Sequence, residues 1–359
     1  MSVPLTAYFR SRGVAQREVT PGLFVPEGFS DPVSEHQATR TRAALFDFSF
    51  MSQFEISGPQ AVAYLHTLQV REIAPVARGR ILYTVLCRED GTVLNDATVW
   101  VHGDGRYWLF TGRRADRDHI QALAERFEVA VEDRSGELSV IALQGPASRL
   151  LLERVDRRLA QELRYFRFAR SAIDDTDVWI GRIGYTGERG YELLIHRAAA
   201  VALWERLRGL GESLGVAECG FETANCLRIE AGYILFAREL HFRVTPAALG
   251  YGRLVVSPNA TALRTPPALL VGLRPASGRP GRAPAPLPGL PDSVLPPVEK
   301  GRACLTSACW SPLYGADLGM GYVCQDDRHP GSRVMLQDGR AARVARLPYY
   351  DPPRAVPRR

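Results

Sequence analysis

Two apolar runs near the middle of the chain flank a glycine-rich stretch of nine residues. The runs, at 176–183 and 193–195, are typical of strands, and the stretch between them is GYTGERGYE at 184–192. Three glycines spaced three residues apart favour a sharp turn, or a backbone that another group can approach closely. The pattern therefore predicts two strands joined by a tight turn, with Glu192 where the second strand begins.

The same reading of apolar and polar positions predicts a hairpin earlier in the chain. Its strands are predicted at 80–87 and 92–101, joined at an Asp-Gly turn, and a third strand follows at 106–111. The sequence SEHQ at 34–37 has the pattern of a capping box, which predicts a helix from there toward residue 44. The other predicted elements are strands at 45–56 and up to Gln144, and helices from 58–59, over about 115–127, from Pro146, and over 203–214 and 222–231.

The last quarter of the sequence is rich in proline and glycine. Residues 275–297 contain eight prolines, which predicts a long, stiff loop. Short strands separated by glycine and proline then continue to residue 350. This spacing predicts a small β-barrel or sandwich at the C-terminal side.

The composition is that of an ordinary globular protein. The 359 residues, 46% hydrophobic and 23% charged, suffice for two or three domains with packed cores. No stretch approaches the roughly 18 apolar residues of a membrane helix, and the first ten residues lack the apolar core of a signal peptide. We therefore expect a soluble, cytoplasmic protein with no membrane partner.

The net charge of +6 comes from arginine, because Lys300 is the one lysine among 45 basic residues. The arginines are scattered rather than clustered, which argues against nucleic acid as a partner, although a mildly basic surface suits an anionic small molecule. Lys300 follows a proline-rich stretch and has no glycine-rich loop before it, so neither a phosphate-binding loop nor a Schiff-base lysine is expected.

Several sequence patterns argue against other kinds of site. The six cysteines form no CxxC pair and the seven histidines no HxxxH or HxH spacing, so no metal site and no disulfide framework is expected, and a reduced cytosol fits best. GESLG at 211–215 matches the GxSxG pattern of serine hydrolases, but it ends an amphipathic helix and is interpreted as helix termination. The GxxGxxG spacing of residues 184–190 is not that of a dinucleotide-binding loop.

Asp96 is the first candidate for chemistry. Alternation along its strand places it on the face of Leu94 and Trp100, where burial would raise its pKa and make it a proton acceptor or donor. If the Asp-Gly turn is a two-residue loop, Val85 lies opposite Asp96 and Tyr83 is its diagonal neighbour on the same face. The alternative is a strand-end aspartate that binds backbone.

Glu192 is the second candidate. It begins a strand between Tyr191 and Leu193, where a carboxylate can accept two N–H donors from a planar, amidine-like ring. The alternative is a strand residue that faces solvent.

Taken together, the segments resemble one family in the same order along nearly the whole chain. The sequence is similar to the folate-dependent aminomethyltransferases, that is, the T-protein of the glycine cleavage system and its relatives. The matching segments are FDFSFM at 46–51, DGTVLND at 90–96, ALQGP at 142–146, GYTGERGYE at 184–192, LRIEAG at 227–232 and short matches between 306 and 349. Each segment alone is weak evidence, whereas the ordered set is specific.

The resemblance implies an α+β fold of three domains arranged as a ring, with tetrahydrofolate in the central hole. The implied domains are a discontinuous folate-binding domain at 1–53 and 138–241, an α+β domain at 54–137 and 242–266, and a C-terminal β-barrel at 267–359 that includes the proline-rich loop 275–297. It also implies that Asp96 lies near the reactive folate nitrogens and that Glu192 binds the amino-pyrimidine edge of the pterin. The other implied site residues are Tyr83, Tyr107, Leu109 and Tyr185 at the cofactor, and Met51 and Phe50 at the entrance for the donor.

Three positions depart from the family pattern. Phe50 replaces the histidine of the first motif, which bears on docking of a lipoyl carrier protein. Asn95 replaces the first aspartate of a paired-aspartate motif. Ala224 replaces an arginine that helps to hold folate in the family, and Arg228 matches a different arginine and cannot simply take its place.

We therefore expect a tetrahydrofolate-dependent one-carbon transferase that moves a methyl or methylene group from a small methylated donor to N5 of tetrahydrofolate. Asp96 would manage the proton or stabilise positive charge on the donor. One alternative is an authentic glycine cleavage T-protein, which acts on an aminomethyl group held by a lipoyl carrier protein. Another is a non-catalytic folate-binding protein of the iron–sulfur assembly type, although LRIEAGY at 227–233 lacks the KGCYxGQE-like motif of that branch.

Overall fold

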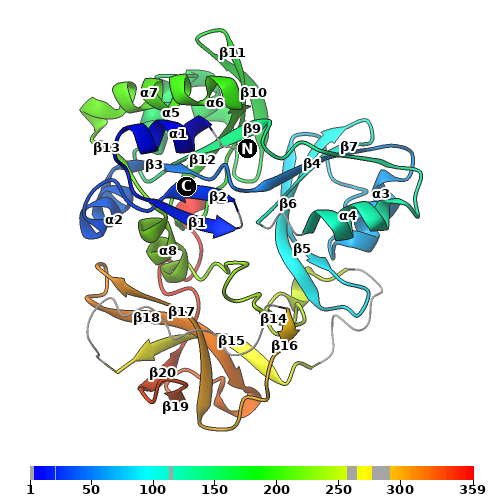
Figure 1. Cartoon of the computed structure of the whole chain (residues 1–359), viewed down its shortest axis with the longest axis vertical. Coiled ribbons are helices and arrows are strands. Elements are labelled where there is room, and N and C mark those ends of the chain that lie inside the picture. The colour runs from blue at the N-terminus through cyan, green and yellow to red at the C-terminus, as the bar shows by residue number, and fades with distance from the viewer. Residues whose placement is uncertain (1–3, 21, 113–115, 257–264, 277–291) are drawn as a thin grey trace.

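The structure, a computed structural model, describes residues 4–20, 22–112, 116–256, 265–276 and 292–359. Its strands form two open sheets and a closed barrel, and Figure 1 shows these three groups beside one another. Two further pairs of short strands, β1 (Gln16–Thr20) with β2 (Leu23–Pro26) and β14 (Phe242–Arg243) with β16 (Ser293–Val294), lie outside them. No helix of the described residues is both long and apolar enough to span a membrane.

The six-stranded sheet has the order β10-β11-β12-β9-β3-β13 and is antiparallel except for the pair β3 and β13. Its strands are β3 (Ala43–Asp47), β9 (Leu138–Gln144), β10 (Phe168–Ile173), β11 (Thr176–Gly181), β12 (Gly190–His196) and β13 (Val216–Glu218). Helices α1 (Pro4–Ser11), α5 (Ser148–Glu153), α6 (Arg157–Glu162) and α7 (Ala200–Gly211) gather over one face of the sheet (Figure 1). Helices α2 (Pro32–Thr41) and α8 (Phe221–Glu230) pack against each other beside it.

The five-stranded sheet has the order β5-β6-β7-β4-β8. Its elements are β4 (Ser52–Ser57), α3 (Ala61–Leu68), β5 (Arg80–Cys87), β6 (Val93–Gly103), β7 (Arg106–Thr111), α4 (Asp116–Ala124) and β8 (Ala130–Asp133). One face buries a continuous apolar cluster with α3 and α4. The barrel, in the order β15-β18-β17-β19-β20, is closed because β20 pairs with β15. Its strands are β15 (Ala268–Pro275), β17 (Arg302–Ser311), β18 (Ala316–Cys324), β19 (Arg333–Leu336) and β20 (Ala341–Ala345).

The hairpin of β5 and β6 has the predicted register, although its loop is longer than predicted and a bulge restores the pairing. Val85 pairs with Asp96, as a two-residue turn would require, but the connecting loop is longer. A bulge at Leu94 compensates for the longer loop, because Cys87 pairs with Val93 on the other side of the bulge. The prediction that Leu94 shares a face with Asp96 is therefore wrong, since Leu94 packs into the apolar cluster under α3 and α4.

Two other element boundaries differ from the predictions. Helix α2 begins at Pro32 rather than Ser34, because the Asp31 side chain accepts a hydrogen bond of 2.9 Å from the Ser34 amide. The predicted single strand at 45–56 is two strands that belong to different sheets, which explains why both halves are apolar. The remaining predicted elements are present with ends displaced by a few residues, and GESLG ends α7 with Gly215 in the left-handed region at φ 65°.

The chain leaves the six-stranded sheet after β3, builds the five-stranded sheet, and returns at β9. This order agrees with a discontinuous first domain, although the proposed domain boundaries stay a prediction. The predicted barrel is confirmed. Of the predicted proline-rich loop at 275–297, residues 277–291 lie outside the described residues.

A buried ion pair joins α8 to the barrel. Arg228 donates to the Glu239 carboxylate at 2.8 Å and to the Ser307 hydroxyl at 2.6 Å, and its side chain is almost wholly inaccessible to solvent. Glu239 also accepts from the Thr306 hydroxyl, at 2.7 Å. These bonds give Arg228 a structural role and commit its guanidinium to Glu239 and Ser307, so it does not take the place of the arginine that the resemblance implies at position 224.

We expect Arg228→Ala to destabilise the fold by about 3–5 kcal/mol, because it leaves the Glu239 carboxylate buried without its cation. Urea unfolding followed by circular dichroism measures this change. Arg170→Ala is the control, because the pair of Arg170 with Asp177 is exposed and its loss should leave the unfolding midpoint unchanged. An unchanged midpoint in Arg228→Ala would contradict the assigned role.

Candidate functional site

A cavity of about 550 Å³ lies where the two open sheets meet the segments that follow α8. Its volume is in the usual range for a small-molecule site. The lining side chains include Phe48, Phe50 and Met51 after β3, Tyr83 and Asp96 on the hairpin, and Tyr185 and Glu192 around the glycine-rich turn. The structure thus brings six predicted site residues, Asp96, Glu192, Tyr83, Tyr185, Met51 and Phe50, to one cavity.

Asp96 faces this cavity beside two tyrosines. The Tyr83 hydroxyl donates to the Asp96 carboxylate at 3.2 Å and lies 3.3 Å from the Tyr251 hydroxyl. Burial raises the pKa of Asp96 to about 7, while the hydrogen bond from Tyr83 acts in the opposite direction. Asp96 therefore exchanges its proton near neutral pH, and its carboxylate contacts the Tyr83 phenol as well as its own backbone amide.

Glu192 lies 8% exposed on the same cavity, so the interpretation of a solvent-facing strand residue is wrong. Burial raises its pKa to about 7. Its carboxylate forms no hydrogen bond or ion pair with any described residue. A buried carboxyl group without a partner is costly, and N–H donors from a ligand would satisfy it.

The glycines of the turn make room for protein rather than for a ligand. A Cβ atom at Gly184 or Gly190 would overlap the Gln144 side chain, which lies between them. Gln144 accepts a hydrogen bond of 2.9 Å from the Thr186 hydroxyl. Glu188 is buried and pairs with Arg40 at 2.8 Å, so it is structural. The turn is therefore rigid, and it holds Tyr185 and Glu192 in place.

Aromatic side chains form much of the remaining wall. Tyr185 and Tyr233 are stacked, with ring centroids 5.9 Å apart at 19°, and the Tyr185 hydroxyl donates to the Ile234 carbonyl at 2.5 Å. Phe50 contacts Phe48 and Phe236 edgewise or tilted, with centroids 6.2 and 6.3 Å apart. Such a wall suits a flat, partly aromatic ligand.

Residues 7–257 match the family model described as the GCVT N-terminal domain. The chain is 32% identical to an aminomethyltransferase of Streptomyces coelicolor over 96% of both chains. The chain belongs to the aminomethyltransferase family. It is also 28% identical to the aminomethyltransferase of Halothermothrix orenii, over 88% of this chain and 89% of that protein. The crystal structure of glycine cleavage system aminomethyltransferase T from Bartonella henselae covers 100% of this chain and 99% of its own, with 25% identity and a TM-score of 0.79.

The comparison confirms the family and the α+β fold of the T-protein type with its C-terminal barrel. It also makes the departures from the aminomethyltransferase pattern informative. Ala224, at the position where the resemblance implies an arginine, is 1% exposed and packs in an apolar cluster with Phe46 and Leu227. Asn95 points away from the cavity and donates to Asp116 at 2.5 Å.

Two predicted residues do not line the cavity. The side chains of Tyr107 and Leu109 belong to the apolar cluster on the opposite face of the five-stranded sheet. Because side chains alternate along a strand, Phe110 presents its side chain to the cavity instead. The Tyr107 side chain therefore does not line the cavity, whereas Leu109 was expected only in a strand whose backbone borders the pterin, and that stays a prediction.

Several lining residues were not predicted. Tyr251, Phe236 and Arg354 come from irregular segments that carry no periodic pattern.

A buried cluster of His36, Cys226 and Glu230 has ligand atoms within 4.8 Å of one another. The Arg40 guanidinium lies 2.5 Å from the Glu230 carboxylate, which His36 also contacts at 2.9 Å. Arg40 therefore supplies the positive charge that a metal ion would bring. We interpret the cluster as a structural network.

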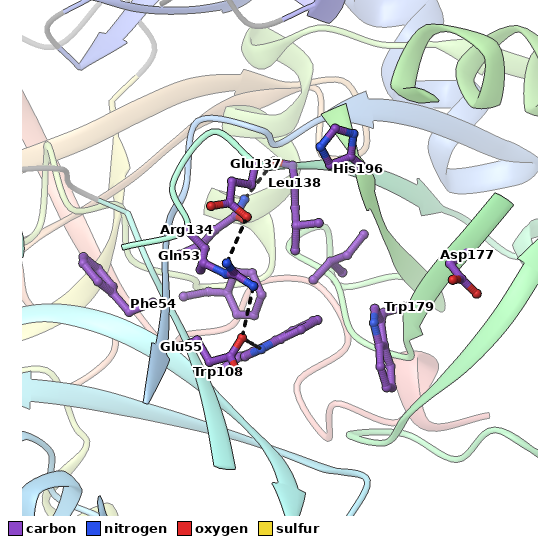
Figure 2. Close-up of a pocket in the computed structure, with 12 residues that line it drawn as sticks. Gln53, Phe54, Glu55, Trp108, Arg134, Glu137, Leu138, Asp177, Trp179 and His196 are labelled. Atoms are coloured by element: carbon purple, nitrogen blue, oxygen red, sulfur yellow. Dashed lines mark hydrogen bonds and ion pairs between the residues drawn. The ribbon is translucent and has the colours of Figure 1, made fainter. Parts of the chain in front are cut away.

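A second, smaller cavity of about 210 Å³ lies between β4, β7 and the edge of the six-stranded sheet (Figure 2). Arg134 lies between Glu55 and Glu137, at 3.6 and 3.4 Å, and Trp108 donates to Glu55 at 3.3 Å. Figure 2 shows these side chains directed at one another. Because these carboxylates already share the Arg134 cation and no predicted site residue lines this cavity, we take the larger cavity as the candidate site.

We expect Glu192→Gln to abolish the part of the fall in free energy of unfolding at rising pH that comes from the Glu192 carboxyl group. A pKa of about 7 in the folded state, against the ordinary 4.5, means that the folded protein holds this proton more tightly than the unfolded chain. The stabilisation by protonated Glu192 is therefore complete below about pH 4.5 and is lost as the pH rises through about 7.

The variant should match the native protein near pH 4.5 and exceed its free energy of unfolding at pH 8 by up to about 3 kcal/mol. Urea unfolding at both pH values measures the difference. Glu125→Gln, at an exposed site on the protein surface, is the control and should show no such difference. A Glu192→Gln curve parallel to the native one at both pH values would rule out a buried, unpartnered carboxyl group.

Proposed function

We propose that this protein transfers an aminomethyl group, held by a lipoyl carrier protein, to tetrahydrofolate. The relatives that match 96% of this chain are named aminomethyltransferases, and the matching crystal structure is a glycine cleavage T-protein. These findings favour the T-protein alternative over the expected transfer from a small methylated donor. The observation that carries the proposal is the meeting of Asp96 and the unpartnered Glu192 in one aromatic cavity.

The residues of the cavity fit tetrahydrofolate. Glu192 offers two carboxylate oxygens without a described partner, and the amino-pyrimidine edge of a pterin offers adjacent N–H donors. Tyr185 and Phe48 contact each other edge to face, with centroids 6.3 Å apart, and present apolar surface to a flat ring. The pairing of a planar ring with a buried carboxylate would remove the cost of leaving Glu192 without donors.

Tetrahydrofolate, when bound, supplies the nitrogen that accepts the carbon unit. Asp96 holds or moves a proton beside that position, because its pKa of about 7 leaves both protonation states populated at neutral pH. Tyr83 keeps the carboxylate oriented through its hydrogen bond of 3.2 Å. The aromatic wall excludes water, and Phe50 and Met51 line the cavity where we place the entrance for the donor.

Asp96→Asn should lower turnover by roughly 10²–10⁴-fold, because the amide can neither take up nor release the proton. The affinity for tetrahydrofolate should change little, since the amide is isosteric with the carboxyl group. Single-turnover kinetics and calorimetry measure the two quantities separately. Turnover equal to that of the native protein would remove Asp96 from the chemistry.

The choice of donor separates the two candidate reactions. The native protein should form 5,10-methylene-tetrahydrofolate and ammonia from an aminomethylated lipoyl carrier protein, and no 5-methyl-tetrahydrofolate from small methylated amines. Product analysis by mass spectrometry distinguishes them. The lipoyl carrier protein without an aminomethyl group is the control. Formation of 5-methyl-tetrahydrofolate from a methylated amine alone would return the reaction to the demethylase class.

A further inference from the structure

The smaller cavity lies where the two open sheets face each other, on the side of each sheet opposite to its helix-covered core. Aromatic rings fill much of that contact, since Trp100 packs against Phe110 and Phe168 with centroids 5.4 and 4.9 Å apart. At the cavity the apolar packing gives way to a mixture of aromatic and polar side chains. The question is which ligand such a mixture would bind.

Two neighbouring strands of the five-stranded sheet supply one wall of the cavity. Gln53 and Glu55 follow each other on one face of β4, and they pair directly with Phe110 and Trp108 of β7. Because paired residues and residues two apart share a face, all four side chains are presented together. One strand thus contributes oxygen acceptors, and its neighbour contributes rings.

The six-stranded sheet supplies the opposite wall, with Trp179 of β11 (Figure 2). The Trp179 and Trp108 rings have centroids 5.5 Å apart and meet at 75°, and Phe110 meets Trp108 at the same angle, with centroids 6.3 Å apart. Both tryptophans are only half-buried. Ring faces of this kind attract alkylated ammonium ions, whose methyl groups lie against the rings while the charge interacts with the π electrons.

The carboxylates of the cavity hold their present cation loosely. Arg134 lies 3.6 Å from Glu55 and 3.4 Å from Glu137, which is longer than the roughly 2.7–2.9 Å of a charge-assisted hydrogen bond. The Arg134 side chain is 43% exposed and can turn into solvent. The cavity is therefore built for a positive charge, and the charge that it contains is replaceable.

Gln53 provides an acceptor that the protein itself does not use. The residue is 2% exposed, and its Nε2 donates to the Leu138 carbonyl at 3.0 Å. Its Oε1 is buried and accepts no hydrogen bond from a described residue. A buried acceptor without a donor is costly, so an N–H group of a ligand would stabilise this wall.

We propose that the smaller cavity is a second binding site, which takes a small alkylated ammonium ion that keeps an N–H group. The alkyl groups lie against Trp108 and Trp179, the charge faces Glu55, and the N–H group donates to Gln53, while Arg134 turns outward. Phe110 lines both cavities, so this site adjoins the candidate site without being part of it. The assignment does not depend on the proposed function.

Calorimetry at neutral pH tests the site, with trimethylammonium as the ligand and tert-butanol as an uncharged analogue of similar shape. The native protein should bind trimethylammonium and not tert-butanol. Arg134→Ala should bind the ion about 3–10-fold more tightly, because no guanidinium competes for the carboxylates. The double variant Glu55→Gln, Glu137→Gln should bind it at least ~10-fold more weakly, and Trp179→Leu about 2–10-fold more weakly.

The exposed pair of Arg126 and Glu89, outside the cavity, gives matched controls. Arg126→Ala and Glu89→Gln remove the same charges and should leave the affinity unchanged. Glu192→Gln should also leave it unchanged, because that carboxyl group belongs to the larger cavity. The gain of affinity in Arg134→Ala guards against a false result, since a loss of folding would only weaken binding.

Equal affinity for trimethylammonium in the native protein, Arg134→Ala and the double variant would overturn the assignment. So would comparable binding of tert-butanol, which would mean that apolar filling rather than charge drives binding. A loss of binding in Glu192→Gln would place the ion in the larger cavity and reject the second site. The absence of binding to both the native protein and Arg134→Ala would also reject it.

Discussion

The buried guanidinium of Arg40 holds together the parts of the molecule on which the cavity depends. It donates to the Thr186 carbonyl and to Glu188 of the glycine-rich turn, each at 2.8 Å, and to Glu230 at the end of α8. The Tyr350 ring lies against its other side, 3.9 Å from the guanidinium carbon. One cation thus fixes the turn, the helix and the C-terminal segment after β20 relative to one another. In a low-dielectric interior these hydrogen bonds and ion pairs are strong, and removal of the cation would leave two carboxylates buried without a partner charge.

This arrangement leaves the two carboxyl groups of the cavity outside the network. Glu188 and Glu230 have a cation, whereas Asp96 has a phenol and its own backbone amide, and Glu192 has no partner among the described residues. Their pKa values near 7 express that difference, because burial without a cation favours the neutral acid. The protein therefore stabilises its scaffold with ion pairs and leaves the two carboxyl groups of the cavity without a cation among the described residues.

The sequence could predict the site residues that lie on strands, where side chains alternate regularly between two faces. It could not predict those that lie in irregular backbone. Asp96 and Tyr83 were predicted from strand alternation, and the bulge at Leu94 preserved their register while it moved Leu94 to the other face. Tyr107 and Leu109 were assigned from the resemblance, and alternation along the same strand places their side chains on the far side of the sheet. Tyr251 and Arg354 lie in irregular backbone, whose course is set by tertiary contacts that no local pattern encodes.

The glycine spacing of the turn had two interpretations, and only packing could separate them. The nearest atoms to the missing side chains of Gly184 and Gly190 belong to Gln144, a residue some forty positions earlier in the chain. A sequence shows that small residues are needed but not which neighbour needs the space. The same limit applies to Ala224, since its apolar surroundings come from strands and loops distant in sequence.

The wall of the cavity contains residues from 48–51 and from 354–358. The ribosome makes the first of these segments early and the second at the end of synthesis. A growing chain can close the six-stranded sheet once β13 has emerged, but it has no complete cavity until the C-terminal segment has docked beside Arg40 and Arg182. Contacts of such long sequence separation cost loop-closure entropy and are slow to form. The complete cavity therefore depends on the last segment of the chain to be synthesised, whereas the six-stranded sheet does not.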